Sequence, residues 1–356
     1  MRFPEFTGEW KKCKLSKVCS FFSGGTPPSS NKEYYNGNIP FIRSGELHND
    51  ETELFITKEG LDNSAAKMVE VGDLLLALYG ATSGDIAISK IKGAINQAIL
   101  CIRTKQNKKF VESVWNKHVA RLLQTYLQGG QGNLSADIVK NISFYFTNIE
   151  EQNKLARFIS LLDQRIAAQN KIIEKLQSLI KGIAQNIVLR NKPNVRISQC
   201  LECSSSTLQE SDVLEYGTYP VYGANGVVGF LDNYNTSNEA IYIIKDGSGV
   251  GAVSYVAGKC SATGTLNILQ AKKGFSLRYL YYLLNIFNFE PYKTGMAIPH
   301  IYFKDYGKAQ IFCPSYSEQL KYAKFLATID GKLLTEQNVL INLSLQKQYL
   351  LRQMFI

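Results

Sequence analysis

The chain has 356 residues, of which 45% are hydrophobic and 20% are charged, and this composition is typical of a globular protein and excludes a disordered one. Its formal net charge of +10 suits a polyanionic partner without proving one. No apolar run reaches the roughly 18 residues that span a bilayer, and the N-terminus "MRFPEFTGEWKKCK" has no signal-peptide core, so we expect a cytoplasmic protein with no membrane partner.

Seven cysteines are scattered along the chain, and only Cys200 and Cys203 stand close together. Such an odd, dispersed set suits reduced thiols in a cytosolic protein. A zinc site would need two more soft ligands at a suitable spacing, and the sequence offers none. We therefore expect ordinary thiols and no bound metal.

The first part of the chain predicts a mixed α/β domain over residues 1–148. The stretch "DLLLALYGATSGDIAI" (73–88) is typical of a strand, a glycine turn and a second strand, and "AILCI" of a further strand. The stretch "VESVWNKHVARLLQTYLQ" then predicts a helix rich in aromatic residues and leucine. A polar loop, "GGQGNLSADIVKN", leads through a short strand to a long helix over residues 149–190.

The second part of the chain repeats this order over residues 191–315. "AIYIIKDGSGVGAVSY" (240–255) aligns with residues 73–88, and "TLNIL" follows it as the further strand. "SLRYLYYLLNIF" predicts the helix, and "MAIPHIYFKDYGK" the polar loop before a short strand. A second long helix is expected over residues 316–356.

The long helices share a repeated phrase. "EEQNKLARFISLLDQRI" returns as "SEQLKYAKFLATIDGKL" without a gap. The identical residues are Glu151, Gln152, Lys154, Ala156, Phe158, Asp163 and Leu176, which meet Glu318, Gln319, Lys321, Ala323, Phe325, Asp330 and Leu343. Seven basic against three acidic residues also make residues 151–190 the most positively charged segment.

Each long helix carries an apolar stripe whose steps alternate between four and three residues, and a mean spacing of 3.5 is the mark of a coiled-coil seam. Both stripes hold a polar residue at the same position, and such a residue can fix register and partner choice. The predicted seam consists of Ile159, Leu162, Ile166, Gln169, Ile173, Leu176 and Ile180 in the first helix, and of Leu326, Ile329, Leu333, Glu336, Leu340 and Leu343 in the second.

The predicted fold class is therefore α+β, with two mixed α/β domains separated by two long helices. Neither helix can bury a one-sided stripe alone, so we expect the two to form an antiparallel coiled coil with an approximate two-fold repeat. Two unrelated amphipathic helices on separate cores would be the alternative, but the gap-free match and the shared polar position argue against it.

Signatures of an enzyme are absent from the sequence. There is no G-x-x-x-x-G-K-[ST] phosphate loop, and "GSGVG" lies between two strands without the helix of a dinucleotide site. The Asn-Pro-Pro-aromatic tetrapeptide of amino-methyltransferases is also missing. The only histidines, His48, His118 and His300, form no catalytic constellation in sequence. We expect a chain without catalytic residues and without a cofactor of its own.

The ordered duplication resembles the specificity subunit of a Type I restriction–modification system. The likeness covers nearly the whole chain and is carried by "EWKKCKLSKVCSFFSGGTP", partly echoed by "NVRISQCLE", by "IPFIRSGEL" with "GDLLLALYGATSGDIAISKIKGAINQAIL", and by the two long helices. The second domain's "YGTYPVYGANGVVGFLDNY" does not match "IPFIRSGEL", which is expected where two recognition domains read different bases.

The resemblance implies a DNA reader without chemistry of its own. Residues 1–148 and 191–315 would be target recognition domains, and each would read one half of a bipartite, asymmetric site in double-stranded DNA. The helices 149–190 and 316–356 would set the spacer and dock two methyltransferase (modification) subunits. Those subunits would bring S-adenosylmethionine, and restriction (motor-nuclease) subunits would bring ATP and Mg²⁺.

Base edges are read by planar donors and acceptors, chiefly Arg, Asn and Gln, with Ser and Thr adaptable. Residues of these kinds, with some aromatic and basic ones, occupy predicted loops of both domains. The candidate DNA-binding residues are Arg43, Ser44, Thr82, Ser83, Asn96, Gln97, Gln131 and Asn133 in the first domain, and Tyr222, Asn225, Lys245, Ser248, Thr263, His300 and Tyr302 in the second.

Two other functions fit the same layout. The chain could be a coiled-coil scaffold whose two domains bind proteins, or the recognition module of a solitary modification enzyme carried on another chain. The salt dependence of binding distinguishes a protein-binding scaffold from a DNA-binding protein, because counterion release makes DNA affinity fall steeply as the salt concentration rises.

Overall fold

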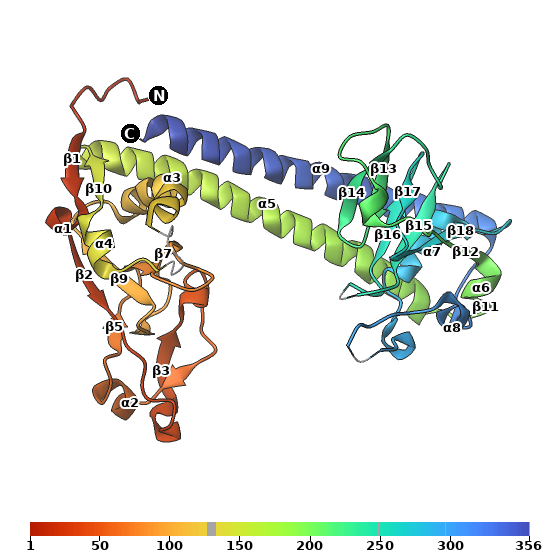
Figure 1. Ribbon diagram of the computed structural model, residues 1–356, viewed down its shortest axis with the longest axis horizontal. Helices are drawn as coiled ribbons and strands as arrows, with labels where there is room; N and C mark the ends of the chain where they lie inside the picture. The colour runs from red at the N-terminus through yellow and green to blue at the C-terminus, as the bar shows by residue number, and fades with distance from the viewer. Residues whose placement is uncertain (127–132, 248, 296, 356) are drawn as a thin grey trace. The chain divides into compact units, whose positions relative to one another are not determined.

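The computed structural model describes residues 1–126, 133–247, 249–295 and 297–355. The chain divides into two compact units, the first formed by Met1–Ala168 with Leu340–Ile356 and the second by Gln169–Val339. Each unit thus combines one α/β domain with a part of both long helices, α5 (Ile149–Leu189) and α9 (Tyr316–Met354) (Figure 1).

The first domain is built from short elements, which in chain order are β1 (Lys11–Lys14), α1 (Leu15–Val18), β2 (Cys19–Ser23), η1 (Lys32–Tyr34), β3 (Tyr35–Ile42), η2 (Ser44–Glu46), β4 (Phe55–Ile56), α2 (Lys58–Asp62), β5 (Lys67–Val69), β6 (Leu74–Ala77), β7 (Ile86–Ile88), β8 (Gly93–Ile95), β9 (Ile99–Thr104), α3 (Lys108–Tyr126), α4 (Ala136–Asn141) and β10 (Ser143–Phe146). An antiparallel sheet has the order β2-β9-β6-β7, and β1 pairs with β10. A further sheet has the order β4-β3-β8-β5, in which β3 and β8 run parallel.

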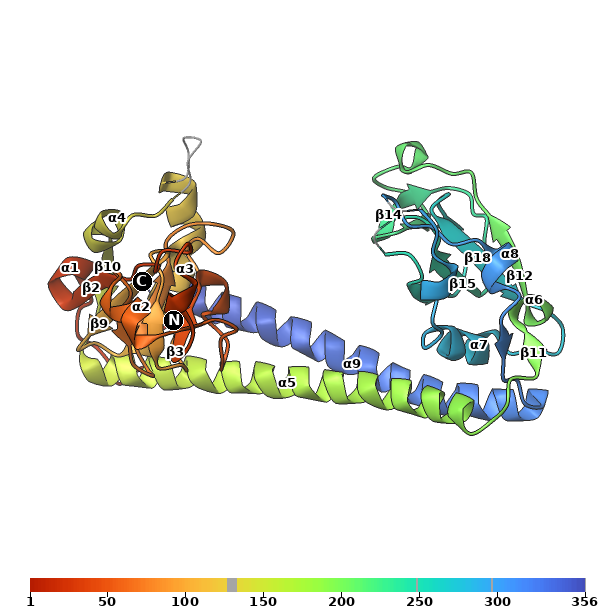
Figure 2. The ribbon, with the colours of Figure 1, turned by 90° about the horizontal axis from the view of Figure 1, so that it is seen from below.

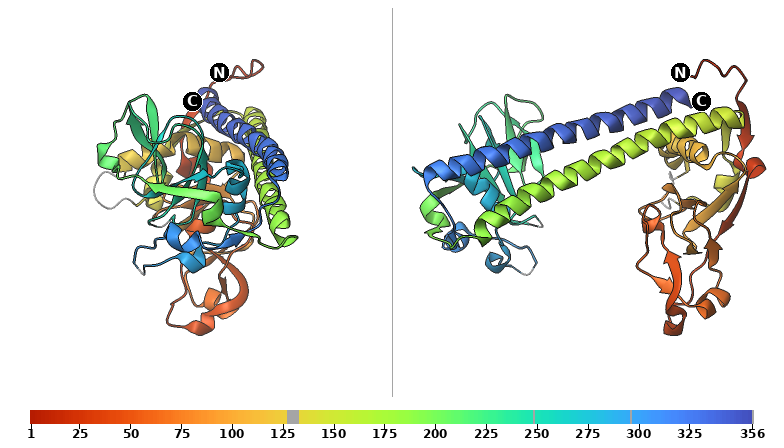
Figure 3. Two further views of the ribbon diagram at one scale, coloured as in Figure 1. Left: turned by 90° about the vertical axis from the view of Figure 1, so that its right-hand side faces the viewer. Right: turned by 180° about the vertical axis from the view of Figure 1, so that it is seen from behind.

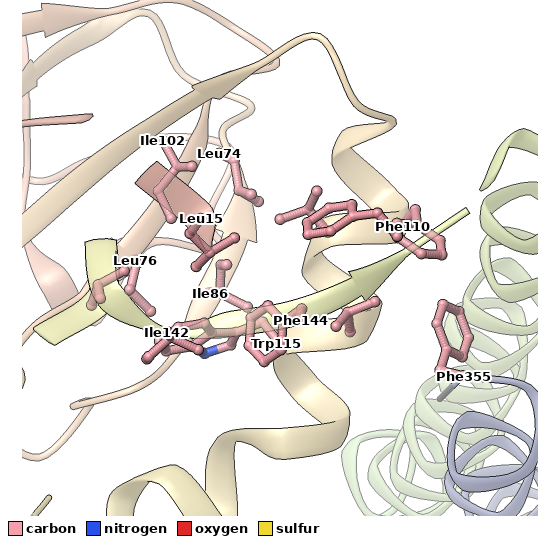
Figure 4. Close-up of a cluster of buried hydrophobic side chains, with 14 of the residues drawn as sticks. Leu15, Leu74, Leu76, Ile86, Ile102, Phe110, Trp115, Ile142, Phe144 and Phe355 are labelled. Carbon is pink, nitrogen blue, oxygen red and sulfur yellow. The ribbon is translucent and has the colours of Figure 1, made fainter. Parts of the chain in front are cut away.

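The core of the first unit lies between the antiparallel sheet and α3. Leu74 and Leu76 of β6 pack with Trp115 of α3, whose indole Nε1 donates to the carbonyl of Gly84 at 2.8 Å. Phe355, just beyond α9, joins the same cluster and contacts Phe110 with ring centroids 5.5 Å apart (Figure 4). The end of the second long helix therefore completes the core of the first domain.

The second domain consists of β11 (Val195–Arg196), α6 (Ile197–Cys200), β12 (Leu201–Ser205), η3 (Glu210–Asp212), β13 (Tyr219–Gly223), β14 (Gly226–Leu231), β15 (Ala240–Ile244), β16 (Val253–Val256), β17 (Ser261–Ala262), β18 (Leu266–Ala271), α7 (Leu277–Leu284), η4 (Glu290–Tyr292), α8 (Phe303–Tyr306) and β19 (Gln310–Ile311) (Figure 2). Its sheets have the orders β12-β18-β15-β16, β14-β13-β17 and β11-β19. In the sheet formed by β13, β14 and β17, the strands β13 and β17 run parallel.

The two domains therefore share most of their topology. The antiparallel sheets β2-β9-β6-β7 and β12-β18-β15-β16 correspond strand for strand, the parallel pair β3–β8 matches β13–β17, and the pair β1–β10 matches β11–β19. The sheet around β3 has four strands, and its counterpart around β13 has three. The predicted strand–turn–strand units are confirmed as β6–β7 and β15–β16. Their turns need glycine, because Gly80 and Gly84, like Gly247 and Gly251, hold φ between +84° and +96°.

Within each unit the two long helices run antiparallel. In the first unit Asp163 pairs with Lys347, while the earlier residue Ile159 shares a core with the later Leu351. In the second unit Gln169 donates to the backbone carbonyl of Glu336 at 3.0 Å, while the later Ile187 shares a core with the earlier Ala323. Every residue of the predicted seam is buried or half-buried.

The N-terminal end of the chain is fastened to the first unit. The amine of Met1 donates to the carbonyl of Gln353 at 2.7 Å, so the first residue lies beside the end of α9 (Figure 3). Trp10, which is 9% exposed, packs against Phe110 with ring centroids 5.6 Å apart. The segment between these two anchors, residues 1–8, is named the N-terminal arm here.

Neighbouring isoleucines of α5 give a matched test of the seam. Ile173 is 8% exposed and Ile172 is 43% exposed. Changing Ile173 to Asp puts an unpaired charge among apolar side chains and should lower the free energy of unfolding by about 3 kcal/mol. The same change at Ile172 should cost about 0.5 kcal/mol or less. Denaturant unfolding of both variants measures the difference, and equal losses would show that the stripe is not buried.

Candidate nucleic-acid interface

A buried glutamine of the repeated phrase joins the first domain to its long helix. Gln152 of α5 is fully buried. Its side-chain oxygen accepts from the backbone N–H of Asn107 at 3.1 Å, and its amide nitrogen donates to the carbonyl of Thr147 at 2.7 Å. Asn107 in turn accepts from the N–H of Phe110 and so caps α3. One amide thus ties the start of α5 to the start of α3.

The second copy of the phrase makes the same connection. Gln319 of α9 is 2% exposed and accepts from the backbone N–H of Ser276 at 2.9 Å. Its amide nitrogen donates to the carbonyl of Pro314 at 2.9 Å. Ser276 caps α7 by accepting from the N–H of Tyr279. Gln152 and Gln319 therefore hold the two domains on their helices in the same way.

The repeated aspartate adds a charged contact in each unit. Asp163 of α5 pairs with Lys109 of α3 at 2.7 Å and with Lys347 at 2.5 Å. Asp330 of α9 lies 3.8 Å from the guanidinium of Arg278 in α7 and accepts from the hydroxyl of Tyr282 at 3.2 Å. Both aspartates face the domain helix.

Backbone hydrogen bonds bring some predicted DNA-binding residues together at the parallel strand pairs. In the first domain the N–H of Asn96, after β8, donates to the carbonyl of Ile42 at 3.4 Å, next to Arg43. In the second, the N–H of Thr263, after β17, donates to the carbonyl of Tyr222 at 2.9 Å. We call the loops that follow these parallel strands the pair loops.

A second meeting point lies at the glycine turns. The N–H of Leu134 donates to the carbonyl of Leu78 at 2.8 Å, which brings Asn133 to the β6–β7 turn. Its counterpart is the N–H of Ile301, which donates to the carbonyl of Lys245 at 2.9 Å. That bond holds His300 and Tyr302 beside the β15–β16 turn. We call these the turn loops.

Arg43, a predicted DNA-binding residue of the first domain, forms ion pairs within that domain. Arg43 donates to Glu46 at 2.9 Å and to Glu53 at 2.8 Å, and these carboxylates raise the pKa of Arg43. Burial alone would raise the pKa of Glu46, but the hydrogen bonds from Arg43 and the backbone outweigh it and lower that pKa to about 2. The guanidinium is thus held by two carboxylates and would share its donors with any base.

The other described candidates of the first domain are half-buried or exposed. Ser83 donates to the carbonyl of Leu78 at 3.0 Å, and Asn96 accepts from the N–H of Ala98 at 3.1 Å. Gln97 is exposed and contacts Thr26. Ser44 and Thr82 are half-buried, Asn133 is exposed, and Gln131 lies outside the described residues.

The candidates of the second domain differ in accessibility. Asn225 is exposed in the turn between β13 and β14, and Tyr302 is 47% exposed. Tyr222 is half-buried against Tyr242, and Lys245 and His300 are also half-buried, while Ser248 lies outside the described residues. Thr263 is 1% exposed and donates to or accepts from Thr265, so its side chain cannot reach a base from this position.

Two basic–aromatic groups escaped the sequence analysis. The ammonium of Lys304 lies 5.0 Å from the ring centre of Tyr302, beside His300 in the turn loops. Lys259 lies 4.9 Å from the ring centre of Tyr234 and 5.8 Å from that of Tyr219. Lys304 follows Tyr302 by two residues, so the sequence could have suggested this group. Lys259 is far from Tyr234 and Tyr219 in sequence, and only the fold brings them together.

Other kinds of site find little support in the described part of the chain. None of its residues gather into a group of three or more His, Cys, Asp or Glu that could hold a metal ion. None of its helices is long and apolar enough to cross a membrane. A hollow of about 590 Å³ in the first unit is lined by both signs of charge, and its acids Asp85 and Asp163 already pair with His48 and with lysines.

Comparison with known proteins identifies the family. The profile of the Type I restriction modification DNA specificity domain matches residues 7–178 and again residues 194–343. These two matches cover most of the chain and coincide with the two copies of the fold. The chain belongs to this family.

Relatives of the specificity family agree with the assignment. The Type I restriction enzyme EcoprrI specificity subunit of Escherichia coli is 22% identical over 90% of this chain and 87% of its own length. The MjaVIII and MjaIX specificity subunits of Methanocaldococcus jannaschii are 23% and 27% identical, and the chain matches only 43% and 42% of their lengths.

Solved structures of the specificity family share the fold. The S subunit of a Type-I restriction-modification system from M. genitalium superimposes with a TM-score of 0.66 at 17% sequence identity, over 98% of this chain and 96% of that chain. A chain from a structural study of complex assembly and conformational transition of the type I R-M system gives 0.55 at 15% identity, over 96% of both chains.

The contact of Asp163 predicts a pH-dependent stability. Burial opposes its ionisation, but the bonds from Lys109 and Lys347 outweigh burial and lower the pKa of Asp163. The ionised form therefore stabilises the fold above the ordinary Asp pKa of about 4, and this stabilisation is lost as the pH falls through the lower folded value. At pH 7, Asp163→Asn should lower the free energy of unfolding by about 1 to 2 kcal/mol.

The matched control is Asp50, whose side chain is 80% exposed although it pairs with Lys90. Asp50→Asn should change stability by about 0.5 kcal/mol or less. Denaturant titrations at pH 7 and pH 3 measure both variants. A loss for Asp163→Asn that is as large at pH 3 as at pH 7 would contradict the charged role.

Proposed function

We propose that the chain is the sequence-specific DNA recognition subunit of a Type I restriction–modification complex. Each α/β domain would read one half of a bipartite, asymmetric site in double-stranded DNA. One observation carries this proposal: the backbone frame is present twice, with the same order in the antiparallel four-stranded sheet, an equivalent parallel strand pair and the same turn-loop bond, while the loops on it carry unlike side chains. A repeated frame with different loops suits two unlike half-sites.

The loops offer the chemistry that base edges require. Asn, Gln, Ser and Thr side chains can donate and accept, and Arg or Lys can contact guanine or phosphate. The proposed readers are the predicted residues that are exposed or half-buried, namely Arg43, Ser44, Thr82, Ser83, Asn96, Gln97 and Asn133 in the first domain, and Tyr222, Asn225, Lys245, His300 and Tyr302 in the second. The net charge of +10 would strengthen the attraction to DNA.

The long helices are proposed to form an antiparallel coiled coil that sets the spacer between half-sites. Their antiparallel packing within each unit and the contact of Gln169 with Glu336 support this part of the proposal. A polar pair in an apolar seam can fix the register of two helices. The register would then fix how many base pairs separate the two reading domains.

The same helices are proposed to dock two methyltransferase subunits, with restriction subunits joining the complex. Apolar side chains remain exposed along both helices and could be covered by partner helices, among them Leu161, Ile172 and Leu179 of α5 and Leu334, Ile341 and Leu345 of α9. We further propose that the chain itself has no catalytic role. The methyl donor and ATP would be bound by the partner subunits.

Exchanging one domain tests the proposal that each domain recognises its half-site independently. Residues 11–146 begin with β1 and end with β10, which pair with each other, so they form a natural cassette. Replacing them by the same cassette of a relative should change one half-site and leave the other unchanged, because the frame and both helices are kept. Methylation mapping in cells that also supply the modification subunits gives the result.

The matched exchange replaces residues 195–311, bounded by the paired strands β11 and β19. It should change the other half-site alone. Either hybrid altering both halves would contradict the proposal that each domain reads independently.

Salt dependence separates a DNA reader from a protein-binding scaffold. Lys245 has no carboxylate partner among the described residues and lies in the turn loops. If it contacts phosphate, Lys245→Gln should weaken binding to all sequences and reduce the slope of log affinity against log salt by about 1. Fluorescence anisotropy of the complex with its modification subunits, at several salt concentrations, measures the slope.

The control variant is Lys175→Gln, at an exposed position of α5 in the same unit. It should leave the slope unchanged. If affinity for duplex DNA did not fall with salt in the unaltered complex, the DNA-reading proposal would fail and the scaffold would be favoured.

A further inference from the structure

The N-terminal arm covers one face of α5. The guanidinium of Arg2 makes two bonds to the carboxylate of Glu151, at 2.6 and 2.7 Å. The ring of Phe3 meets Phe158 edge-on, with ring centroids 6.2 Å apart. The carboxylate of Glu5 forms an ion pair with Lys154 of α5. The arm thus uses a cation, an aromatic ring and a carboxylate at positions i, i+1 and i+3.

The three arm-binding residues of α5 lie on one side of the helix. Glu151, Lys154 and Phe158 are spaced by three and four residues, which places them in one row along the helix. All three are among the residues that the second copy of the phrase preserves. They differ from Gln152 and Asp163 of the same phrase, which hold the domain.

The second unit presents the same row without a cover. Its members on α9 are Glu318, Lys321 and Phe325. Phe325 is 57% exposed. Among the described residues, Glu318 is bonded to Ser315 and to none of the basic side chains, and Lys321 has no ion-pair partner. Ring contacts of the kind that Phe3 makes with Phe158 are likewise missing for Phe325 in this part of the chain.

We propose that the row Glu318, Lys321 and Phe325 binds an extended segment of another protein chain, in the way that the first row binds the N-terminal arm. The segment would present a basic residue, an aromatic residue and an acidic residue at positions i, i+1 and i+3. Charge complementarity selects it, because Glu318 attracts a cation and Lys321 a carboxylate, and both lie in one row with the exposed ring of Phe325. The chain's own arm is already engaged, since Met1 and Trp10 anchor it at both ends.

This site is independent of DNA reading. None of its three residues lies in the pair loops or turn loops, and the inference rests on comparing the two rows. This proposal would hold even if the chain did not bind DNA. If no segment bound the row, this proposal would fail and the proposed DNA recognition would be unaffected.

The probe is the octapeptide of residues 1–8, with a photoreactive benzophenone side chain in place of Phe6. In the first unit the ammonium of Lys154 lies 5.9 Å from the Phe6 ring, so this position should sit close to Lys321 in the second row. The peptide is irradiated with the full-length protein, and mass spectrometry maps the attached residues. We expect attachment within residues 318–328, reduced at least tenfold by Phe325→Ala.

Two controls keep the test decisive. Leu334→Ala removes an equally exposed apolar side chain of α9, which is 60% exposed, and should not reduce attachment. Lys321→Glu should abolish attachment, and a peptide with Lys in place of Glu5 should restore it. Because these side chains are exposed, all variants should keep the unfolding curve of the unaltered protein. Attachment no stronger than that of a scrambled peptide, or unchanged in Phe325→Ala, would overturn the proposal.

Discussion

A buried side-chain amide fixes each domain on its long helix, beside a shared apolar core and a charged contact. A buried amide is costly unless both its oxygen and its nitrogen find partners. Gln152 meets this demand with the N–H of Asn107 at the cap of α3 and with the oxygens of Thr147 and Gln106, and Gln319 meets it with the cap of α7 and Pro314. The domain helix, the connecting loop and the long helix must therefore keep one mutual geometry, and the loops are carried on that geometry.

Main-chain hydrogen bonds hold the loops in place, so the side chains on these loops are free to vary. The turn loops are closed by backbone groups, from Leu134 to Leu78 and from Ile301 to Lys245, so apart from the turn glycines no particular residue is required there. The pair loops are joined in the same manner. A frame closed by main-chain bonds tolerates almost any side chain on its loops. Two domains that recognise different base sequences would require this freedom in their loop side chains.

Patterns of short range in the sequence predicted much of this fold. Alternating steps of three and four predicted the long helices, and glycines between apolar runs predicted the β6–β7 and β15–β16 turns, because each pattern reports a local backbone preference. The parallel pairs β3–β8 and β13–β17 were not foreseen, since their partners are far apart in sequence. For the same reason the carboxylates around Arg43 and the burial of Thr263 became visible only in the folded chain.

The two copies of the fold are preceded by different segments of the chain, and this difference breaks their symmetry. The repeated phrase gives α5 and α9 the same row of Glu, Lys and Phe, yet among the described residues the N-terminal arm covers the row on α5 and no segment covers the row on α9. The segments that precede the two domains differ, because the N-terminal arm precedes β1 whereas α5 itself precedes the counterpart strand β11. Identical residues therefore meet different surroundings in the two units. The repeat sets what each helix face can bind, and the course of the chain decides which face is already occupied.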